Sequence, residues 1–275
     1  MYIIAVIFIF LLGLVLGSFV NALQYRIAES MTMGGRSLCP NCKHQLSALD
    51  LVPVFSWILL GGKCRYCKKP IAIQYPLVEI LSGLSLIFLA TEFGLLLPFL
   101  TTGSLLATSW LLYALQFIAV TGISTILILL ALHDYKTGFV LSTYAYVAVG
   151  LVALMASFPT TSFIGWAALL PYVYASIGAA VPFALLWAIS RGRWMGAGDI
   201  ELALLVGLLL GWPRVIIGLY FAFIVGSIVG VALIANKKSK MKSEIAFGPF
   251  LIAGIYFALA FGQQIIDIYV RIFLG

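Results

Sequence analysis

The sequence has few charged residues, and it lacks the motifs of several large enzyme classes. Charged side chains make up 9% of its 275 residues, whereas soluble domains carry about 25%. The motifs G-x-S-x-G, H-E-x-x-H and the P-loop are all absent. A serine-driven, zinc-driven or nucleotide-driven mechanism therefore has little support.

Sequence patterns typical of other architectures are missing as well. There is no low-complexity tract, no repeat of about 20–50 residues, and no series of roughly ten-residue alternating segments typical of a membrane β-barrel. Instead, 63% of the residues are hydrophobic, and several apolar runs exceed the roughly 18 residues that mark a membrane-spanning helix. The sequence therefore predicts an all-α polytopic membrane protein.

We expect about eight transmembrane helices. The first lacks the positive amino-terminal region of a signal peptide and is too long for one, so we expect it to be retained. The sixth is short for a hydrocarbon core of ~30 Å, which indicates a tilted helix or half of a hairpin broken at Trp212-Pro213. The predicted spans are 2–22, 76–95, 105–132, 139–158, 163–190, 200–212, 214–235 and 247–270.

The basic residues predict how the chain is oriented. The net charge is +7, which we interpret as the cytoplasmic excess of Lys and Arg typical of membrane proteins rather than as a nucleic-acid surface. With the amino terminus outside, only Arg214 and Arg271 fall on the outer side. The inner side then holds Arg26, Arg36, Lys43, Lys63, Arg65, Lys68, Lys69, Lys136, Arg191, Arg193, Lys237, Lys238, Lys240 and Lys242.

A polar insert between the first two spans contains all four cysteines, spaced C-x2-C-x21-C-x2-C. They are Cys39 and Cys42 in "CPNC" and Cys64 and Cys67 in "CRYC". Two such pairs can complete a tetrahedral four-sulfur zinc site with no open position, so the metal would be structural. Disulfides are the alternative, but the charge pattern places the insert in the reducing cytoplasm. We therefore expect three parts: a first helix (1–23), a cytoplasmic zinc-binding insert (24–74) and a helical domain (75–275).

Two of the nine carboxylates stand out because they end or begin apolar runs. Asp134, in "LALHDYKTGF", closes the third predicted span, and Asp199, in "GAGDIEL", opens the sixth. The predicted topology brings both to the inner edge of the membrane. The alternatives are that Asp199 only caps the amino terminus of a helix, and that Asp134 is an interfacial residue paired with Lys136.

Two carboxylates a few ångströms apart would share one proton, and such a pair can perform aspartic proteolysis. The ionised member activates a water while the protonated member polarises a peptide carbonyl, and the pair titrates as a unit. Gly196 and Gly198 leave the backbone beside Asp199 without side chains, so a peptide substrate could approach closely.

Taken together, several blocks of the sequence resemble one family, the type IV prepilin leader peptidases, which are intramembrane aspartic peptidases with a G-x-G-D motif. The resemblance covers nearly the whole chain. It is carried, in the family's order, by "GSFVNALQYRI", "CPNC…DLVPVFSWILLGGKCRYCKKPI", "YPLVEIL", "GAGDIELA" and "FGPFL". One departure is that the family's first aspartate block usually has a proline several residues on, where this chain has Val140 or Leu141.

The resemblance implies a function and a location. Asp134 and Asp199 would be the catalytic pair of a multi-pass protein of the bacterial inner membrane. It would cleave the short basic leader of prepilins or pseudopilins at the cytoplasmic face. Members with the cysteine insert often also methylate the new amino terminus with S-adenosylmethionine, for which the sequence has no Gly-rich nucleotide loop. Besides its substrates, the expected partner is the lipid bilayer; nothing in the sequence sets the oligomeric state.

Two other classes of protein fit parts of the pattern. Broken helices with carboxylates also form ion sites in membrane transporters, although such sites tend to lie near the middle of the membrane. A non-enzymatic assembly scaffold built on the zinc insert is the third possibility.

Overall fold

A computed structural model describes every residue except 1, 33, 97–106, 157–164, 237–245 and 274–275. In the described part of the chain the secondary structure is helical, apart from two isolated bridges that pair Leu38 with Gln45 and Lys63 with Pro70. The chain divides into two compact units, Met1–Leu129 and Leu130–Gly275. The predicted inner-face residues Lys237, Lys238, Lys240 and Lys242 lie outside the described residues.

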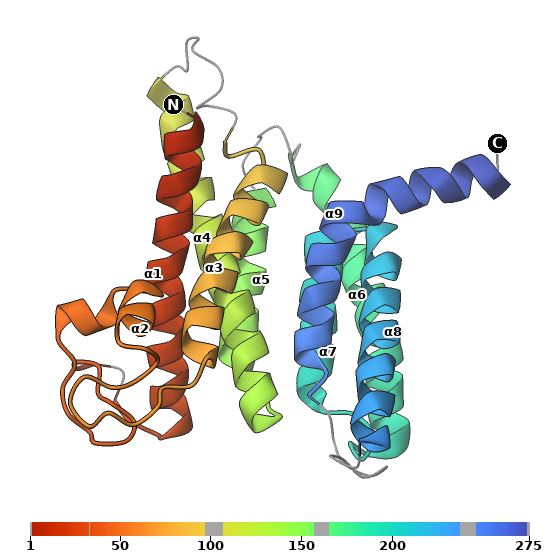
Figure 1. Cartoon of the computed structure of the whole chain (residues 1–275). Helices are drawn as coiled ribbons and strands as arrows, with labels where there is room; N and C mark the ends of the chain where they lie inside the picture. Colours follow the sequence, from red (N-terminus) through yellow and green to blue (C-terminus); the bar gives the residue numbers. More distant parts are fainter. Residues whose placement is uncertain (1, 33, 97–106, 157–164, 237–245, 274–275) are drawn as a thin grey trace. The chain divides into compact units, whose positions relative to one another are not determined.

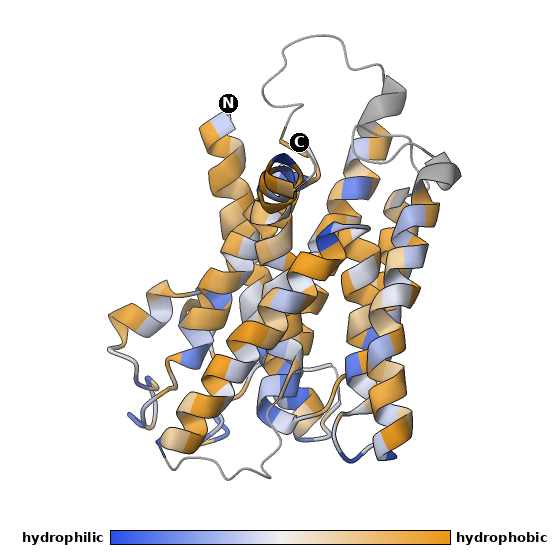
Figure 2. Cartoon of the chain, turned by 90° about the vertical axis from the view of Figure 1, so that its right-hand side faces the viewer, coloured by the Kyte–Doolittle hydropathy of each residue, from blue (hydrophilic) through white to orange (hydrophobic). Residues whose placement is uncertain are grey.

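The first unit contains α1 (Tyr2–Ala28), the insert with a short 3-10 helix η1 (Ala48–Leu51) and α2 (Phe55–Leu59), then α3 (Gln74–Glu92) and most of α4 (Ala107–Thr137). The second unit begins in the last turns of α4 and continues with α5 (Ser142–Ala156), α6 (Gly165–Ser190), α7 (Ala197–Leu210), α8 (Arg214–Ala235) and α9 (Gly248–Phe273). The helices are mainly hydrophobic along their length (Figure 2).

Each of the eight predicted spans coincides with a helix, but within the described residues six helices are long and apolar enough to cross a membrane. The other two are α5, with 15 residues, and α7, with 14. At 1.5 Å per residue, α7 is about 21 Å long, shorter than a hydrocarbon core of ~30 Å. The all-helical polytopic fold is as predicted, and by length and composition the number of spans in the described part of the chain is somewhat below the eight expected.

In the first unit, α1 and α3 lie side by side because small residues allow their backbones to approach closely (Figure 1). A Cβ atom at Gly13 would lie 2.6 Å from the Cα of Gly83, and one at Gly17 would lie 2.6 Å from the Cα of Glu79. Close packing of this kind drives association between membrane helices. It also holds Glu79, on α3, against the end of α1 that leads into the insert.

The second unit is built from two tightly packed helix pairs, α6 with α7 and α8 with α9. Gly207 of α7 contacts the backbone of Ser176 on α6, whose hydroxyl donates a hydrogen bond of 2.7 Å to the carbonyl of Leu204. Gly254 of α9 packs directly against the carbonyl of Gly218 on α8. These contacts fix α7 and α9, which both contribute to the site described next.

Candidate active site and metal centre

Asp134 lies near the end of α4, and its carboxylate is buried, with 3% of the residue exposed. The backbone N–H of Gly248 donates a hydrogen bond of 2.8 Å to its Oδ2. Gly248 is the first residue of α9, so this N–H has no partner within its own helix and is available to an anion. Asp134 is therefore held by the start of another helix.

Any residue other than glycine at position 248 would force its neighbours to move. A Cβ atom there would lie 2.6 Å from Oδ2 of Asp134 and 3.0 Å from Cδ1 of Leu202. Sequence reasoning did not single out Gly248 as a site residue, because "FGPF" indicates only a tight turn before a helix. The signal that could have pointed to it is the "FGPFL" block within the family resemblance.

Asp199 is the third residue of α7, and Gly196 takes the N-cap position. Asp199 is therefore not itself the N-cap residue of this helix. The backbone N–H of Gly196 interacts with the Asp199 carboxyl, as the third residue of a helix does in half of a capping box. Each aspartate is thus held by the N–H of a glycine at the start of a helix: Gly248 for Asp134 and Gly196 for Asp199.

Other contacts bring the start of α7 close to the end of α4. A Cβ atom at Gly198 would lie 2.5 Å from the Cβ of Val140, in the segment between α4 and α5. Leu202, one turn beyond Asp199, reaches the Gly248 position that bonds Asp134. The charges of Asp134 and Asp199 are close enough to interact. Val140 stands where the family usually has proline, and here it packs on Gly198.

The remaining predicted residues of this region have different surroundings. Gly196 is exposed and extended, with φ −73° and ψ 150°, and the nearest atom to a Cβ added there is Oδ2 of Asp199 at 3.8 Å. Gly198 is covered by Val140, so of the two glycines only Gly196 leaves open backbone. Glu201 accepts a hydrogen bond of 3.2 Å from the hydroxyl of Tyr146 on α5. Its carboxylate is therefore engaged by a residue other than the two aspartates.

The four cysteines form a compact cluster in the insert of the first unit. Their sulfur atoms all lie within 4.8 Å of one another, and the Sγ atoms of Cys39 and Cys67 are 4.0 Å apart. Zn–S bonds of about 2.3 Å in a tetrahedron place sulfurs ~3.8 Å apart, so the cluster fits a metal ion of this size. All four cysteines are free thiols, which is contrary to the disulfide alternative.

The two cysteine pairs have the same backbone structure. In the first, Lys43 N–H donates to the Cys39 carbonyl at 2.9 Å, and in the second, Lys68 N–H donates to the Cys64 carbonyl at 3.0 Å. Both lysines have φ of 57°. Burial raises the pKa of the Cys39 thiol, but the backbone amides of Cys42 and Asn41 outweigh it and lower the pKa to about 7. The first turn thus favours a thiolate at Cys39. The backbone amide of His44 lowers the pKa of Cys42, but burial and the thiols of Cys39 and Cys67 outweigh it and raise that pKa.

Asp50 links the second cysteine pair to the segment that follows the first. Its Oδ1 accepts a hydrogen bond of 2.6 Å from Nε of Arg65, and its Oδ2 accepts from the Ser47 hydroxyl at 2.8 Å and the Tyr66 hydroxyl at 3.3 Å. The ring of His44, which follows the first pair, lies 3.8 Å from the ring of Tyr66 between centroids. His44 therefore packs beside the cluster and is not a fifth ligand.

Comparison with known proteins identifies the family. The profile described as the bacterial peptidase A24 N-terminal domain matches residues 11–93, and that of the type IV leader peptidase family matches residues 121–231. No solved structure matches the chain significantly.

Curated relatives match over almost the whole length. The prepilin leader peptidase/N-methyltransferase of Aeromonas hydrophila is 30% identical over 97% of this chain and 94% of its own. The protein of the same name from Bacillus subtilis is 28% identical over 97% and 98%, and that from Pseudomonas aeruginosa 27% identical over 95% and 92%. The resemblance found in the sequence is thereby confirmed, and the chain belongs to the type IV leader peptidase family.

Proposed function

We propose that this protein cleaves the leader of type IV prepilins or pseudopilins with Asp134 and Asp199 as its catalytic pair. The observation that carries the proposal is the environment of the two carboxylates. The Gly248 N–H fixes Asp134 by a hydrogen bond, the Gly196 N–H interacts with Asp199, and the two carboxylates interact electrostatically. A fixed pair of interacting carboxylates is the arrangement that aspartic proteolysis requires.

The proposed reaction needs only water and the two side chains. One carboxylate takes a proton from the water that attacks the scissile carbonyl, while the protonated carboxyl donates a hydrogen bond to the carbonyl oxygen. The proton then passes to the leaving amine. Because the pair titrates as a unit, neither aspartate is assigned a single role. The exposed backbone of Gly196 would accept an extended substrate segment beside Asp199.

The proposed location follows from the charge pattern and the helices. We infer a multi-pass protein of the bacterial inner membrane, with its amino terminus outside and with the cysteine insert and aspartates at the cytoplasmic face. In that compartment the cysteine cluster would hold a structural zinc ion. We retain the functional division into a first helix (1–23), a zinc-binding insert (24–74) and a peptidase domain (75–275) as part of this proposal.

The names of the relatives combine peptidase with N-methyltransferase, and we propose both activities for this chain. S-adenosylmethionine would supply an activated methyl group for the amino terminus that cleavage releases. A pocket of the first unit is lined by a buried carboxylate, Glu79, which suits a cationic donor.

Mass spectrometry of a candidate prepilin tests both activities at once. We expect incubation with the purified protein to release the leader, and added S-adenosylmethionine to increase the mass of the mature product by one methyl group. An uncut prepilin, with a protein that retains its fold and metal, would contradict the peptidase proposal. A cut product that gains no methyl group would contradict the methyltransferase proposal alone.

The structure and the family do not favour a membrane transporter. Asp134 is in the last turn of α4 and Asp199 in the first turn of α7, whereas transport sites tend to lie in the middle of the membrane. The scaffold alternative predicts that replacing either aspartate leaves prepilin processing intact, and it is separated from the peptidase by the aspartate variants discussed below.

A further inference from the structure

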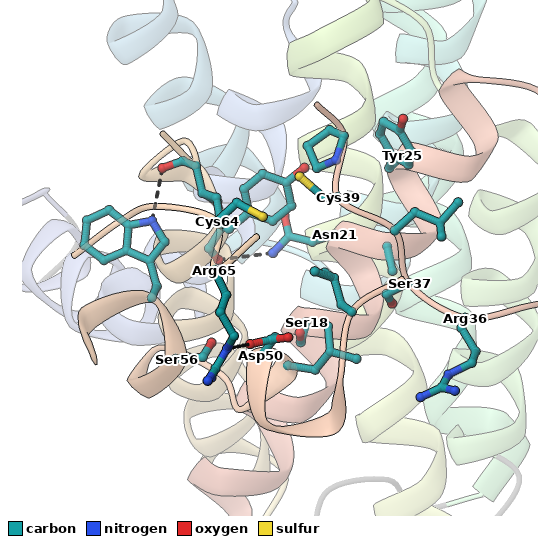
Figure 3. Close-up of a pocket in the computed structure, with 18 of the residues that line it drawn as sticks. Ser18, Asn21, Tyr25, Arg36, Ser37, Cys39, Asp50, Ser56, Cys64 and Arg65 are labelled. Atoms are coloured by element: carbon teal, nitrogen blue, oxygen red, sulfur yellow. Dashed lines mark hydrogen bonds and ion pairs between the residues drawn. The ribbon is translucent and has the colours of Figure 1, made fainter. Parts of the chain in front are cut away.

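A pocket of about 140 Å³ lies in the first unit, between the end of α1, the cysteine insert and the start of α3 (Figure 3). Cys39 and Cys64 form part of its wall, so the metal centre supports one side of it. None of the aspartate site belongs to this pocket. The polar residues in its lining therefore have no role in the peptidase reaction proposed above.

Glu79 of α3 is a buried carboxylate in the wall of this pocket, with 7% of the residue exposed. It accepts a hydrogen bond of 2.7 Å from the backbone N–H of Val54 and another from the Ser18 hydroxyl. It forms no ion pair with any residue that the structure describes. A charged group in the membrane region is costly unless it pairs with something, so Glu79 is suited to a ligand that carries positive charge.

Asn21 of α1 offers a second unused acceptor in the same lining. Its Nδ2 donates a hydrogen bond of 3.1 Å to the carbonyl of Tyr75, which fixes the orientation of the amide. Its Oδ1 is buried and has no hydrogen-bond partner, while only 4% of the residue is exposed. A buried acceptor without a partner is destabilising, and a ligand with N–H donors would satisfy it.

The rest of the lining suits a nucleoside with a positive charge and a carboxylate. Trp57 and Tyr75 provide aromatic surface for a base and for a cation. The indole N–H of Trp57 already donates to the carbonyl of Ile71 at 3.1 Å, so the ring is held in place. Arg36, exposed at the edge, can bind a carboxylate.

We propose that this pocket binds the cationic end of S-adenosylmethionine, with Glu79 facing its positive charge and Asn21 Oδ1 accepting a hydrogen bond from it. A volume of about 140 Å³ holds only that part of the donor, so the remainder lies outside the pocket. The inference rests on the methyltransferase activity proposed above and assigns that activity to the first unit. In the transfer, the amine nitrogen forms a bond to the methyl carbon. The carbon–sulfur bond breaks with its electron pair going to sulfur, and the amine gives up a proton to solvent.

Direct binding to the zinc-loaded, full-length protein tests the assignment. Glu79→Gln keeps an oxygen that can accept from Val54 but removes the charge. Loss of a charge-assisted contact predicts that equilibrium dialysis of S-adenosylmethionine gives at least about tenfold weaker binding. Leader cleavage and zinc content should stay at wild-type values. Glu92→Gln, an exposed charge at the other end of α3, is the matched control and should bind like the wild type.

Two further measurements keep the test independent of one variant. Asn21→Ala should also weaken binding, and ultraviolet labelling by bound S-adenosylmethionine should mark peptides within 18–79. Equilibrium dialysis with S-adenosylhomocysteine, which lacks the sulfonium charge, shows which cationic group of the donor Glu79 faces. Glu79→Gln weakens both ligands if Glu79 faces their ammonium group, and only the methyl donor if it faces the sulfonium.

Different results would contradict the pocket assignment, the choice of ligand and the methyltransferase proposal. Wild-type affinity in both variants, or a label in the second unit, overturns the pocket assignment while methylation itself can stand. If Glu79→Gln instead weakens only the binding of a mature pilin peptide with a free amine, and not of its acetylated form, the pocket holds the acceptor and the donor assignment is wrong. If the wild type neither binds the donor nor methylates a cut prepilin, the methyltransferase proposal fails as well.

Discussion

Asp134 and Asp199 are held in similar ways by different helices. The N–H of Gly248 fixes Asp134 and that of Gly196 interacts with Asp199, and both glycines stand at helix starts. In each case the helix terminus provides a free donor and favours negative charge. The catalytic proposal depends on these two contacts as much as on the carboxylates.

The carboxylates themselves give the first prediction. Asp134→Asn and Asp199→Asn keep the shape of the side chain but cannot share a proton, so either should lower prepilin cleavage by more than about 10³-fold. Cleavage is followed by mass spectrometry, with the helical circular dichroism as a check of folding. The control is Asp267→Asn, since Asp267 lies on α9 and contacts only Gln263 in the described hydrogen bonds. Wild-type cleavage in Asp199→Asn would exclude the pair.

The hydrogen bond from Gly248 to Asp134 gives the second prediction. In Gly248→Ala the new Cβ would lie 2.6 Å from Oδ2 of Asp134, so the carboxylate or the start of α9 must move. We expect cleavage to fall by about 10²-fold, the cost of a misplacement near 1 Å. Gly178→Ala is the matched control, because a Cβ at that α6 position meets nothing within 4 Å. Equal activity in the two variants would mean that the Gly248 contact does not position Asp134.

At the residue scale, the two aspartates could be predicted as site residues from the sequence, but the residues that contact them could not. Both lie at the ends of apolar runs, and the alternation of spans puts those ends on one side of the membrane. The bond from Gly248 to Asp134 joins residues 114 positions apart, and a glycine before a proline predicts a helix start whether or not a carboxylate is near. Contacts of this kind depend on tertiary packing that composition does not encode.

At the scale of elements, apolar runs predicted where the helices lie, and their ends were less certain. The sixth predicted span begins at 200, whereas α7 begins at Ala197 and places Asp199 inside its first turn. The two glycines make this start difficult to recognise, because glycine is a weak helix former. The repeated C-x2-C pattern, in contrast, predicted a shared metal site. The lysine that follows each pair, Lys43 or Lys68, has the same positive φ, so the two turns have the same backbone structure.

Asp50 gives a prediction for the stability of the insert. Burial raises its pKa, but bonds from Ser47 and the charge of Arg65 outweigh burial and hold it below its usual value. Asp50→Asn should therefore speed zinc release to a chelator at neutral pH, by about tenfold. Because the folded pKa is lowered, the advantage of the wild type is present above the usual pKa of about 3.9 and lost as the pH falls through the folded value.

The exposed carboxylate Glu29 provides the control for Asp50. Glu29→Gln should release zinc like the wild type at every pH. If Asp50→Asn releases zinc at the wild-type rate at neutral pH, the charge of Asp50 does not stabilise the insert.

At the scale of the whole molecule, the two compact units correspond roughly to the two family profiles. One profile matches 11–93, within the first unit, and the other matches 121–231, mostly within the second. Hydropathy predicted where the helices lie. It did not predict which helices pair within a unit, because membrane helices pair through small residues such as Gly13 and Gly207 that occur throughout the chain.

Removal of the metal should separate the two activities. Cys39 and Cys64 line the pocket that contains Glu79, so loss of zinc should disorder that wall. The contacts of Asp134 come from Gly248 and Leu202 in the second unit. We expect a chelator, or Cys64→Ser, to lower binding of the methyl donor by at least about tenfold while leader cleavage falls less. Dialysis and mass spectrometry on the same samples measure both. A parallel loss of the two activities would mean that the metal supports the peptidase site as well.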